Sequence, residues 1–219
     1  MSDIAASAEL MDRIYRRQRH LYDFTRKYYL LGRDRLIDRL TPPAGTRVLE
    51  IGCGTARNLV RASRAYPDVH FFGIDISSEM LETARHVVEH EGLAPYIRLA
   101  RADATTFDPA LQFGVPGFSR IFASYTLSMI PGWQAVLARA LGWLGPEGEL
   151  HIVDFGGQER LPVWFRLGLR AWLGLFHVTP RDSLEVELTL AGLRAGALTT
   201  FERPWRGYTQ YAVCRRLPR

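Results

Sequence analysis

The chain has 219 residues, of which 47% are hydrophobic, 23% are charged and 11% are aromatic. This balance predicts a globular protein with a large core and excludes a disordered chain, a collagen-like fibre and a multi-pass membrane protein. Two cysteines are too few for a disulfide framework, and the start of the chain lacks the pattern of a secretory signal. We therefore expect a cytoplasmic protein.

The net charge of +5 is unevenly distributed. Between Arg13 and Arg39 nine basic residues oppose three acidic ones, which gives +6 for this window and −1 for the remainder. Lys27 is the only lysine, and arginine is favoured where a carboxylate or phosphate is bound through two hydrogen bonds. A basic, aromatic-rich window suits nucleic acid, an anionic membrane surface or an acidic substrate group, and it also suits a solvated helix face.

The first 44 residues are expected to be mainly helical. Apolar residues recur at helical spacing over residues 10–40, and Gly32 is a point at which this stretch can divide into two helices. The sequence Thr-Pro-Pro-Ala-Gly at 41–45 forms a turn that ends it.

Beyond residue 45, short apolar runs alternate with helical patterns. The runs that predict strands cover residues 47–51, 69–75, 96–101, 120–124 and 149–155. Helices are expected at 58–65, from a Ser77 cap to about residue 91, at 133–144 and at 182–193. This alternation indicates βαβ units and a parallel sheet. Runs at 197–201 and 208–214 have no helix between them, so one of this pair should run antiparallel to the rest.

Residues 161–178 form an unusually apolar segment, interrupted by Arg166 and Arg170 at i and i+4. It is either a helix buried in a cap or an interfacial helix lying at a membrane. With 18 residues and two charges, an interfacial helix should lie on a bilayer rather than cross it. The aromatic side chains that would reach the acyl boundary are Trp164, Phe165, Trp172 and Phe176.

The segment from Val48 to Asn58 is the most informative for function. Gly52 and Gly54 directly follow a predicted strand, which permits a tight turn and close approach of a ligand at a helix N-terminus. A dinucleotide-binding fingerprint would need a third glycine at the position of Arg57, so a nicotinamide-dependent oxidoreductase is disfavoured.

Three acidic residues stand near the carboxyl ends of three successive predicted strands. They are Glu50, Asp75 and Asp103. In doubly wound folds, ligands bind in the crevice at this edge of the sheet. An acid ending the second strand can accept hydrogen bonds from two ribose hydroxyls.

With these motifs the chain resembles the class I S-adenosylmethionine-dependent methyltransferases over roughly residues 45–214. The resemblance implies a Rossmann-like α/β fold with a seven-stranded, mostly parallel sheet and an antiparallel last strand. It also implies a basic, aromatic helical lid at 1–44 and a cofactor-binding domain at 45–219 with an apolar helical insert at about 158–180. Ala56 replaces the third glycine that many members have, and alanine is small enough to fit.

The cofactor implied by this resemblance is S-adenosylmethionine. The glycine loop would hold its methionine part in front of Glu50, Asp75 its ribose and Asp103 its adenine amino group, with Ile76 and Met80 packed on the adenine. The full set of expected cofactor contacts is Tyr22, Glu50, Gly52, Cys53, Gly54, Asn58, Asp75, Ile76, Met80, Asp103, Ala104, Thr105 and Ser124.

Residues 22–37 and 124–131 are similar to the corresponding segments of the bacterial betaine-lipid N-methyltransferases. These enzymes convert diacylglyceryl homoserine to diacylglyceryl trimethylhomoserine, and phosphatidylethanolamine N-methyltransferases are their near relatives. The resemblance implies a lipid substrate. The basic window at 13–39 and the apolar stretch at 161–178 predict peripheral contact with an anionic membrane surface. No nucleic-acid partner is expected, and the oligomeric state stays open.

Methyl transfer to an amine moves positive charge from sulfur to nitrogen, and aromatic rings stabilise a cation by about 0.5–2 kcal/mol each. Tyr15, Tyr22, Tyr28, Tyr29 and Tyr125 are available for such a cage. Tyr22, Tyr28 and Tyr125 are the expected catalytic residues, and Tyr29 and Tyr125 are also expected to contact the substrate. A tyrosine, His20 or water can take the proton that the amine loses.

The homoserine carboxylate requires a cation, which Arg19, Arg26 or Arg33 can supply. His86 and His90 have no third ligand, so no metal is expected. Neither cysteine has an activating partner in the sequence pattern. A nucleic-acid methyltransferase is disfavoured because no Asn/Asp-Pro-Pro-aromatic motif follows the fourth strand. A membrane-binding module without activity and an enzyme for a small soluble amine or acid remain as alternatives.

Overall fold

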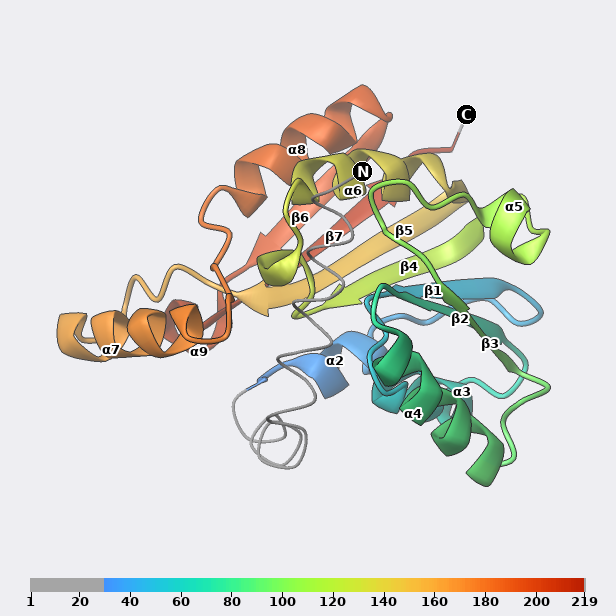
Figure 1. The fold of residues 1–219 in the computed structure, drawn as a ribbon. Helices are drawn as coiled ribbons and strands as arrows, with labels where there is room; N and C mark the ends of the chain where they lie inside the picture. The colour runs from blue at the N-terminus through green and yellow to red at the C-terminus, as the bar shows by residue number, and fades with distance from the viewer. Residues whose placement is uncertain (1–29, 219) are drawn as a thin grey trace.

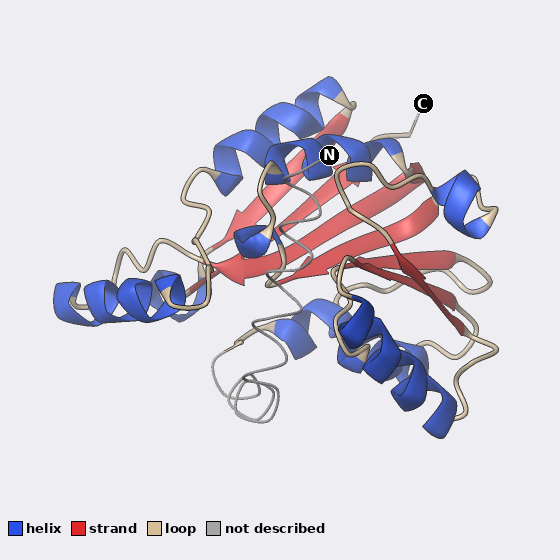
Figure 2. Cartoon of the chain, in the orientation of Figure 1, coloured by secondary structure: helices blue, strands red, loops and turns tan. Residues whose placement is uncertain are grey.

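Seven strands form one sheet in the computed structural model of the chain, which describes residues 30–218 (Figures 1 and 2). The strands are β1 (Arg47–Ile51), β2 (His70–Asp75), β3 (Ile97–Arg101), β4 (Phe118–Ser124), β5 (Leu144–Phe155), β6 (Ala197–Glu202) and β7 (Thr209–Arg216). Their order is β3-β2-β1-β4-β5-β7-β6. Strands β1 to β5 pair in parallel, whereas β7 runs antiparallel to both β5 and β6. The seven-stranded, mostly parallel sheet with an antiparallel last strand is therefore confirmed.

Helices cover both faces of this sheet (Figure 1). They are α2 (Arg33–Asp38), α3 (Arg57–Ala65), α4 (Ser78–His90), α5 (Pro109–Phe113), α6 (Trp133–Gly142), α7 (Val163–Gly174), α8 (Leu184–Arg194) and α9 (Pro204–Gly207), with the short 3-10 helix η1 (Leu127–Met129). One core lies under α6 and α8, and a second lies under α2, α3 and α4. Side chains alternate along a strand, so β1, β2, β4 and β5 each place residues in both cores.

The N-terminal boundary expected at residue 44 does not coincide with a break in packing. Gly32 adopts a left-handed conformation (φ 86°) at the start of α2, and the helix expected before it falls almost entirely outside the described residues. Leu36, Ile37 and Leu40 are completely or almost completely buried, in the same core as Val48 of β1. The described end of the N-terminal region is therefore part of the main fold.

Several elements differ from the sequence expectation. Helix α6 ends at Gly142 and β5 already begins at Leu144, because a register shift between Phe118 and Arg120 lets β4 pair with this early part of β5. The unexpected helix α5 begins with a capped Asp108-Pro109 start, a pattern readable in the sequence.

The two C-terminal elements differ in detail as well. Helix α7 begins after Pro162 and stops at Gly174, so it is shorter than the apolar segment. Between β6 and β7 the chain makes the single turn α9, in which Trp205 and Arg206 adopt left-handed conformations. Within residues 30–218, no helix is long and apolar enough to cross a membrane.

Candidate active site

The glycine loop after β1 is held against the ends of two neighbouring strands. Gly52 has a φ of 69°, and a Cβ built on it would lie 2.3 Å from Cγ2 of Thr126. The backbone N–H groups of Gly52 and Cys53 both donate to the carbonyl of Ile74, at 2.8 and 3.0 Å. This close packing explains why position 52 needs glycine. At Gly54 an added Cβ would meet nothing within 4 Å, so the loop is open on that side.

Asp75 ends β2 directly beside this loop. One carboxylate oxygen accepts the N–H of Gly54 at 2.8 Å, and the other accepts the N–H of Ser77 at 3.0 Å. A carboxylate can accept roughly four hydrogen bonds, so this arrangement is compatible with ribose hydroxyls as further donors. Asp75 thus links the loop to the start of α4, where Ser77 caps the helix as expected through Met80 N–H.

Glu50 lies beneath the loop, with only 1% of its surface exposed. Its Oε1 accepts a hydrogen bond of 2.8 Å from Nδ2 of Asn58, and its Oε2 has no partner among the described residues. Burial raises the pKa of Glu50 to about 8, although the Asn58 hydrogen bond and the positive charge of Arg33 oppose this shift. A cation bound next to Oε2 would bring this pKa down and satisfy the buried oxygen.

The acid after β3 is oriented by its own loop. Oδ1 of Asp103 accepts both the N–H and the hydroxyl of Thr105, at 2.8 and 2.7 Å. Ala104 between them is buried. In this arrangement Thr105 holds the Asp103 carboxylate in place rather than pointing its hydroxyl to a ligand.

Met80 and Ile76 lie on the neighbouring wall. Met80 is 4% exposed and packs against Phe176, which follows α7. Ile76 is half-buried, and its carbonyl accepts a hydrogen bond of 3.0 Å from Nε of Arg101. The structure therefore brings the segment after α7 to the side of the crevice expected to hold adenine.

Tyr125 follows β4 in a left-handed conformation (φ 56°), which is uncommon for a bulky residue and is concentrated at functional sites. Its ring is 2% exposed and packs edge-on against Phe155 at 4.7 Å between centroids. Its hydroxyl donates to the carbonyl of Leu31 at 2.6 Å, and burial raises its pKa well above the usual range. In this conformation Tyr125 joins the N-terminal segment to the crevice instead of presenting its ring to a substrate.

The other residues expected at this edge take different places. Ser124 is buried, with an Oγ that has no partner within residues 30–218. Burial raises the pKa of the Cys53 thiol well above its usual value, which suits a packing residue rather than a nucleophile. Ala56, in the place of the third glycine, is left-handed at φ 63° and fully buried.

Arg33 is the one described member of the expected arginine set, and it lies close enough to lower the pKa values of both Glu50 and Tyr125. The remaining predictions lie outside the described residues. They concern Tyr15, Arg19, His20, Tyr22, Arg26, Tyr28 and Tyr29.

Two residues near the site, Thr126 and Asp154, were not predicted from the sequence. Thr126 packs over Gly52, as described above. Asp154 near the end of β5 is fully buried and accepts the N–H groups of Ser128 and Phe155 at 3.0 and 2.8 Å. Burial raises the pKa of Asp154 to about 6. The rule that located Glu50 and Asp75, an acid at the carboxyl end of a strand, also applies to Asp154.

This donor and acceptor set fits S-adenosylmethionine. The open face at Gly54 admits the backbone approach of a ligand, and the orphaned Oε2 of Glu50 suits the ammonium group of the methionine part. Asp75 and the oriented Asp103 suit hydroxyl and amino donors.

Comparison with known proteins gives consistent results. Residues 48–148 match the family described as methyltransferase domain. A phosphatidylethanolamine N-methyltransferase of Cereibacter sphaeroides is 31% identical over 169 residues, which cover 73% of this chain and 79% of that protein. A demethylmenaquinone methyltransferase of Listeria welshimeri is 30% identical over 121 residues, which cover 55% of this chain and 49% of that protein.

Solved structures agree on the fold at lower identity. The YcgJ protein from Bacillus subtilis has a TM-score of 0.67 at 14% identity and covers 86% of this chain and 99% of its own. The S-adenosylmethionine-dependent methyltransferase SibL, solved in its apo form, has a TM-score of 0.64 at 20% identity, covering 92% of this chain and 57% of its own. Both likenesses concern the arrangement of strands and helices.

Proposed function

Since the chain belongs to the class I S-adenosylmethionine-dependent methyltransferases, we propose that it methylates the amine of a lipid head group, with diacylglyceryl homoserine as acceptor and diacylglyceryl trimethylhomoserine as final product. The observation that carries this proposal is the similarity of residues 22–37 and 124–131 to betaine-lipid N-methyltransferases. Generic cofactor binding does not demand these residues.

A second acceptor, phosphatidylethanolamine, is favoured by a separate observation. The Cereibacter sphaeroides relative carries that activity in its name and matches this chain over most of both lengths. Both candidates are lipids with a head-group amine, so they share the same chemistry at the acceptor nitrogen. They differ in the acidic group beside the amine, which is a carboxylate in one and a phosphate in the other.

The bound cofactor supplies a methyl group on a positively charged sulfur. The chain's own residues bind and orient it: the Gly52–Gly54 loop with Glu50 on one side, Asp75 and Asp103 on the other. We assign the acidic part of a head group to Arg33, whose positive charge lowers the pKa values of Glu50 and Tyr125. Tyr125 holds the described start of the chain through its hydrogen bond to the carbonyl of Leu31.

A methylation assay with three acceptors tests the acceptor assignment. Diacylglyceryl homoserine and phosphatidylethanolamine are offered in detergent micelles, and soluble homoserine is offered in the same detergent-containing buffer. The product masses count the methyl groups added to each acceptor. We expect three additions to diacylglyceryl homoserine, because a quaternary amine has no proton left to lose and no lone pair to react. Turnover of soluble homoserine at the same rate would contradict a lipid acceptor, and turnover of phosphatidylethanolamine alone would select the second candidate.

Substitutions test the residues assigned to each part of the site. We expect Asp75→Ala to weaken cofactor binding by about 1–3 kcal/mol in calorimetric titration, the scale for lost hydrogen bonds to a charged acceptor. We expect Tyr22→Ala and Tyr28→Ala to slow turnover about tenfold or more, roughly 1.4 kcal/mol of barrier. Tyr96→Ala, at a 45% exposed tyrosine before β3, is the matched control. Unchanged turnover in both N-terminal variants would remove them from the site.

A further inference from the structure

Helix α7 has an inverted distribution of polarity. Every residue of α7 that is exposed is either apolar or glycine, whereas its two charged residues, Arg166 and Arg170, are only partly exposed. Trp164 and Leu175 are 75% and 74% exposed, and Leu167 is 61% exposed. We call these exposed residues, with the helix cap, the outward face of α7: Val163, Trp164, Phe165, Leu167, Gly168, Ala171, Gly174 and Leu175. A surface helix ordinarily shows the opposite pattern, with polar residues outside.

The exposure does not come from poor anchoring, because the other side of α7 is fixed to the fold. Arg170 donates to Gln158 at 3.1 Å and to both carboxylate oxygens of Asp182 at 2.7 and 3.0 Å. Leu173 is 1% exposed, and Gln158 is completely buried. The helix is thus clamped at its base from both flanking segments, while its outward face has open space beyond Gly168 and Gly174.

The charge around α7 favours an anionic partner. Residues 160–181 contain four arginines and no acidic residue, and the acids at the two ends of this window, Glu159 and Asp182, pair with Arg203 and Arg170. Arg170 and Arg181 are hydrogen-bonded within the protein, whereas Arg160 is exposed and Arg166 is half-buried. Two copies of this chain meeting through α7 would bring these like charges together, which is unfavourable. An anionic bilayer offers an acyl boundary for the apolar side chains and opposite charge for the arginines.

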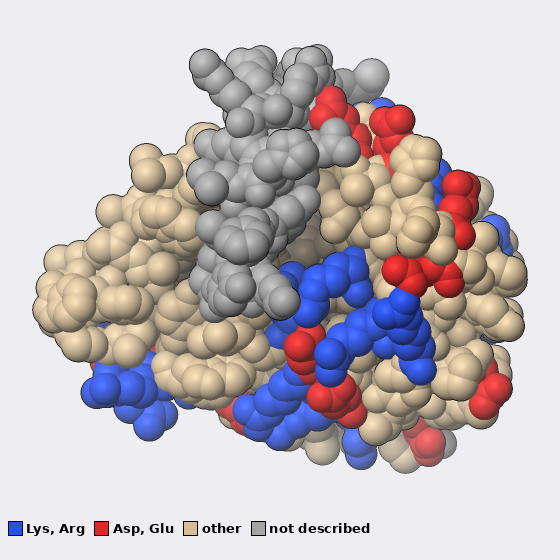
Figure 3. Space-filling model, turned by 90° about the horizontal axis from the view of Figure 1, so that it is seen from below, with Lys and Arg blue, Asp and Glu red and all other residues tan. Residues whose placement is uncertain are grey.

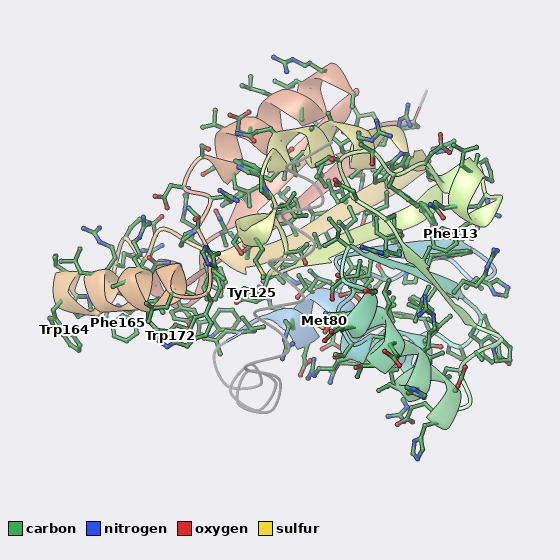
Figure 4. All side chains as sticks on the ribbon, in the orientation of Figure 1. Met80, Phe113, Tyr125, Trp164, Phe165 and Trp172 are labelled. Carbon is green, nitrogen blue, oxygen red and sulfur yellow. The ribbon has the colours of Figure 1, made fainter. Side chains whose placement is uncertain are left out.

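The placement of α7 also suits a bilayer. It extends beyond the carboxyl edge of the sheet (Figure 1), and Trp164, Phe165 and Trp172 leave it on the lower side in Figure 4. Figure 3 views the molecule from that side, where arginine side chains gather over α2 and α3. Part of that charge is neutralised, since Arg57 and Arg61 pair with Asp34 and Asp38. A 12-residue helix is about 18 Å long, too short to span a bilayer of about 30 Å.

We propose that the outward face of α7 docks flat on an anionic bilayer, with Trp164 and Leu167 at the acyl boundary and Arg160 and Arg166 at the head-group level. Because Phe176 packs on Met80, docking places the cofactor crevice next to the membrane surface. This part of the inference rests on the proposed function, since a lipid acceptor must reach the crevice from a bilayer. The docking surface itself is defined by α7 alone.

Vesicle sedimentation tests the docking surface directly. The full-length protein is mixed with vesicles of phosphatidylcholine alone or with one third phosphatidylglycerol, at low and high salt. The test variant is Leu167→Asp, and the matched control is Leu193→Asp on α8, because the two leucines are 61% and 64% exposed. We expect binding to the anionic vesicles that falls with salt, a loss of about tenfold or more in Leu167→Asp, and no loss in Leu193→Asp.

Three results would overturn the proposal. The first is an absence of binding to anionic vesicles, and the second is equal binding by wild type and Leu167→Asp. The third is a wild-type dimer in analytical ultracentrifugation that Leu167→Asp converts to a monomer, which would identify a second copy as the partner. Cofactor titration of Leu167→Asp checks that the variant is folded. Failure of the acceptor assignment is distinguishable, because micellar lipid methylation is measured without vesicles.

Discussion

Two buried glutamates on the same face of the sheet have opposite electrostatic surroundings, which lower the pKa of one and raise the pKa of the other. Glu149 of β5 is 4% exposed and is surrounded by Arg120, Arg215 and His151, at 3.4, 2.5 and 2.9 Å. Burial works to raise its pKa, but these partners bring it down to about 2. Glu50 of β1 is 1% exposed, and among residues 30–218 its hydrogen-bond partner is one neutral amide; burial raises its pKa to about 8.

This difference separates a structural charge from a functional one. The fold supplies Glu149 with its own cations, so that carboxylate is complete without any ligand. Glu50 has an oxygen without a described partner at the bottom of an open glycine loop, and its burial is costly until a cation arrives. Perturbed acids in a crevice are candidates for ligand binding on this ground. We infer that the Glu50 carboxylate pairs with the ammonium group of the bound cofactor.

The largest expected effect on stability is that of removing the Glu149 carboxylate, which pairs with Arg120. Glu149→Ala should lower the free energy of unfolding by about 3–5 kcal/mol, because Arg120, with only 11% of its side chain exposed, loses its charge partner. Denaturant unfolding measures this, and cofactor affinity of the remaining folded protein should be unchanged. Glu147→Ala, at an exposed position of the same strand, is the control. Equal stability of the two variants would contradict the structural role of Glu149.

Glu50→Gln should act in the opposite direction in the ligand-free protein. The raised pKa means that the unfolded chain releases the Glu50 proton above pH 4.5 while the folded protein keeps it up to about pH 8. Wild-type stability therefore falls through this window by at most about 1.4 kcal/mol per pH unit, and glutamine removes this contribution. The advantage of Glu50→Gln should grow from pH 5 to pH 8. A constant difference would mean that Glu50 is ionised in the free protein.

Glu149→Gln provides the reverse trend. Its lowered pKa contributes stability that is present above pH 4.5 and lost as the pH falls towards 2. The glutamine variant should therefore be less stable than wild type at neutral pH, and this deficit should shrink on acidification. Chemical unfolding between pH 2.5 and 7 measures it. A deficit that stays constant with pH would show that the carboxylate charge is not what stabilises this strand.

The smallest expected effect is that of Arg215→Ala. The side chain of Arg215 is 68% exposed, and Arg120 and His151 remain on Glu149 without it. We therefore expect a loss of less than about 1 kcal/mol, the range for exposed ion pairs. A loss as large as that of Glu149→Ala would instead assign the stabilisation to this one arginine.

Much of the fold was predictable because its signals are local. The strand-loop-helix unit from β1 to α3 follows from glycine placement, and the Ser77 cap follows from capping chemistry. The antiparallel C-terminal strand follows from a connection between β6 and β7 that is too short for a parallel crossover, since it holds only the single turn α9. The early start of β5 was not predictable, because Pro146 and two nearby glycines favour a turn and only pairing with Phe118 makes this stretch a strand. Tertiary pairing overrode local preference there.

The candidate site was predictable where its residues stand at strand ends, as Glu50, Asp75 and Asp103 do. The surroundings of each site residue in the folded protein could not be predicted from the sequence. Tyr125 is buried by Phe155 and by a bond to Leu31, 94 residues away in sequence, which no local pattern indicates. The orphaned oxygen of Glu50 depends in the same way on what surrounds it in three dimensions.

Proton release on cofactor binding tests most directly whether Glu50 pairs with the ammonium group of the cofactor. Calorimetric titration with S-adenosylmethionine at pH 6.5, in two buffers of different ionisation enthalpy, measures the protons exchanged. At this pH free Glu50 is protonated and an ammonium of pKa about 8 is charged, so binding that ionises Glu50 releases about one proton. We expect this release in wild type and its loss in Glu50→Gln, together with weaker binding. Binding without proton release in wild type, or equal release in Glu50→Gln, would contradict it.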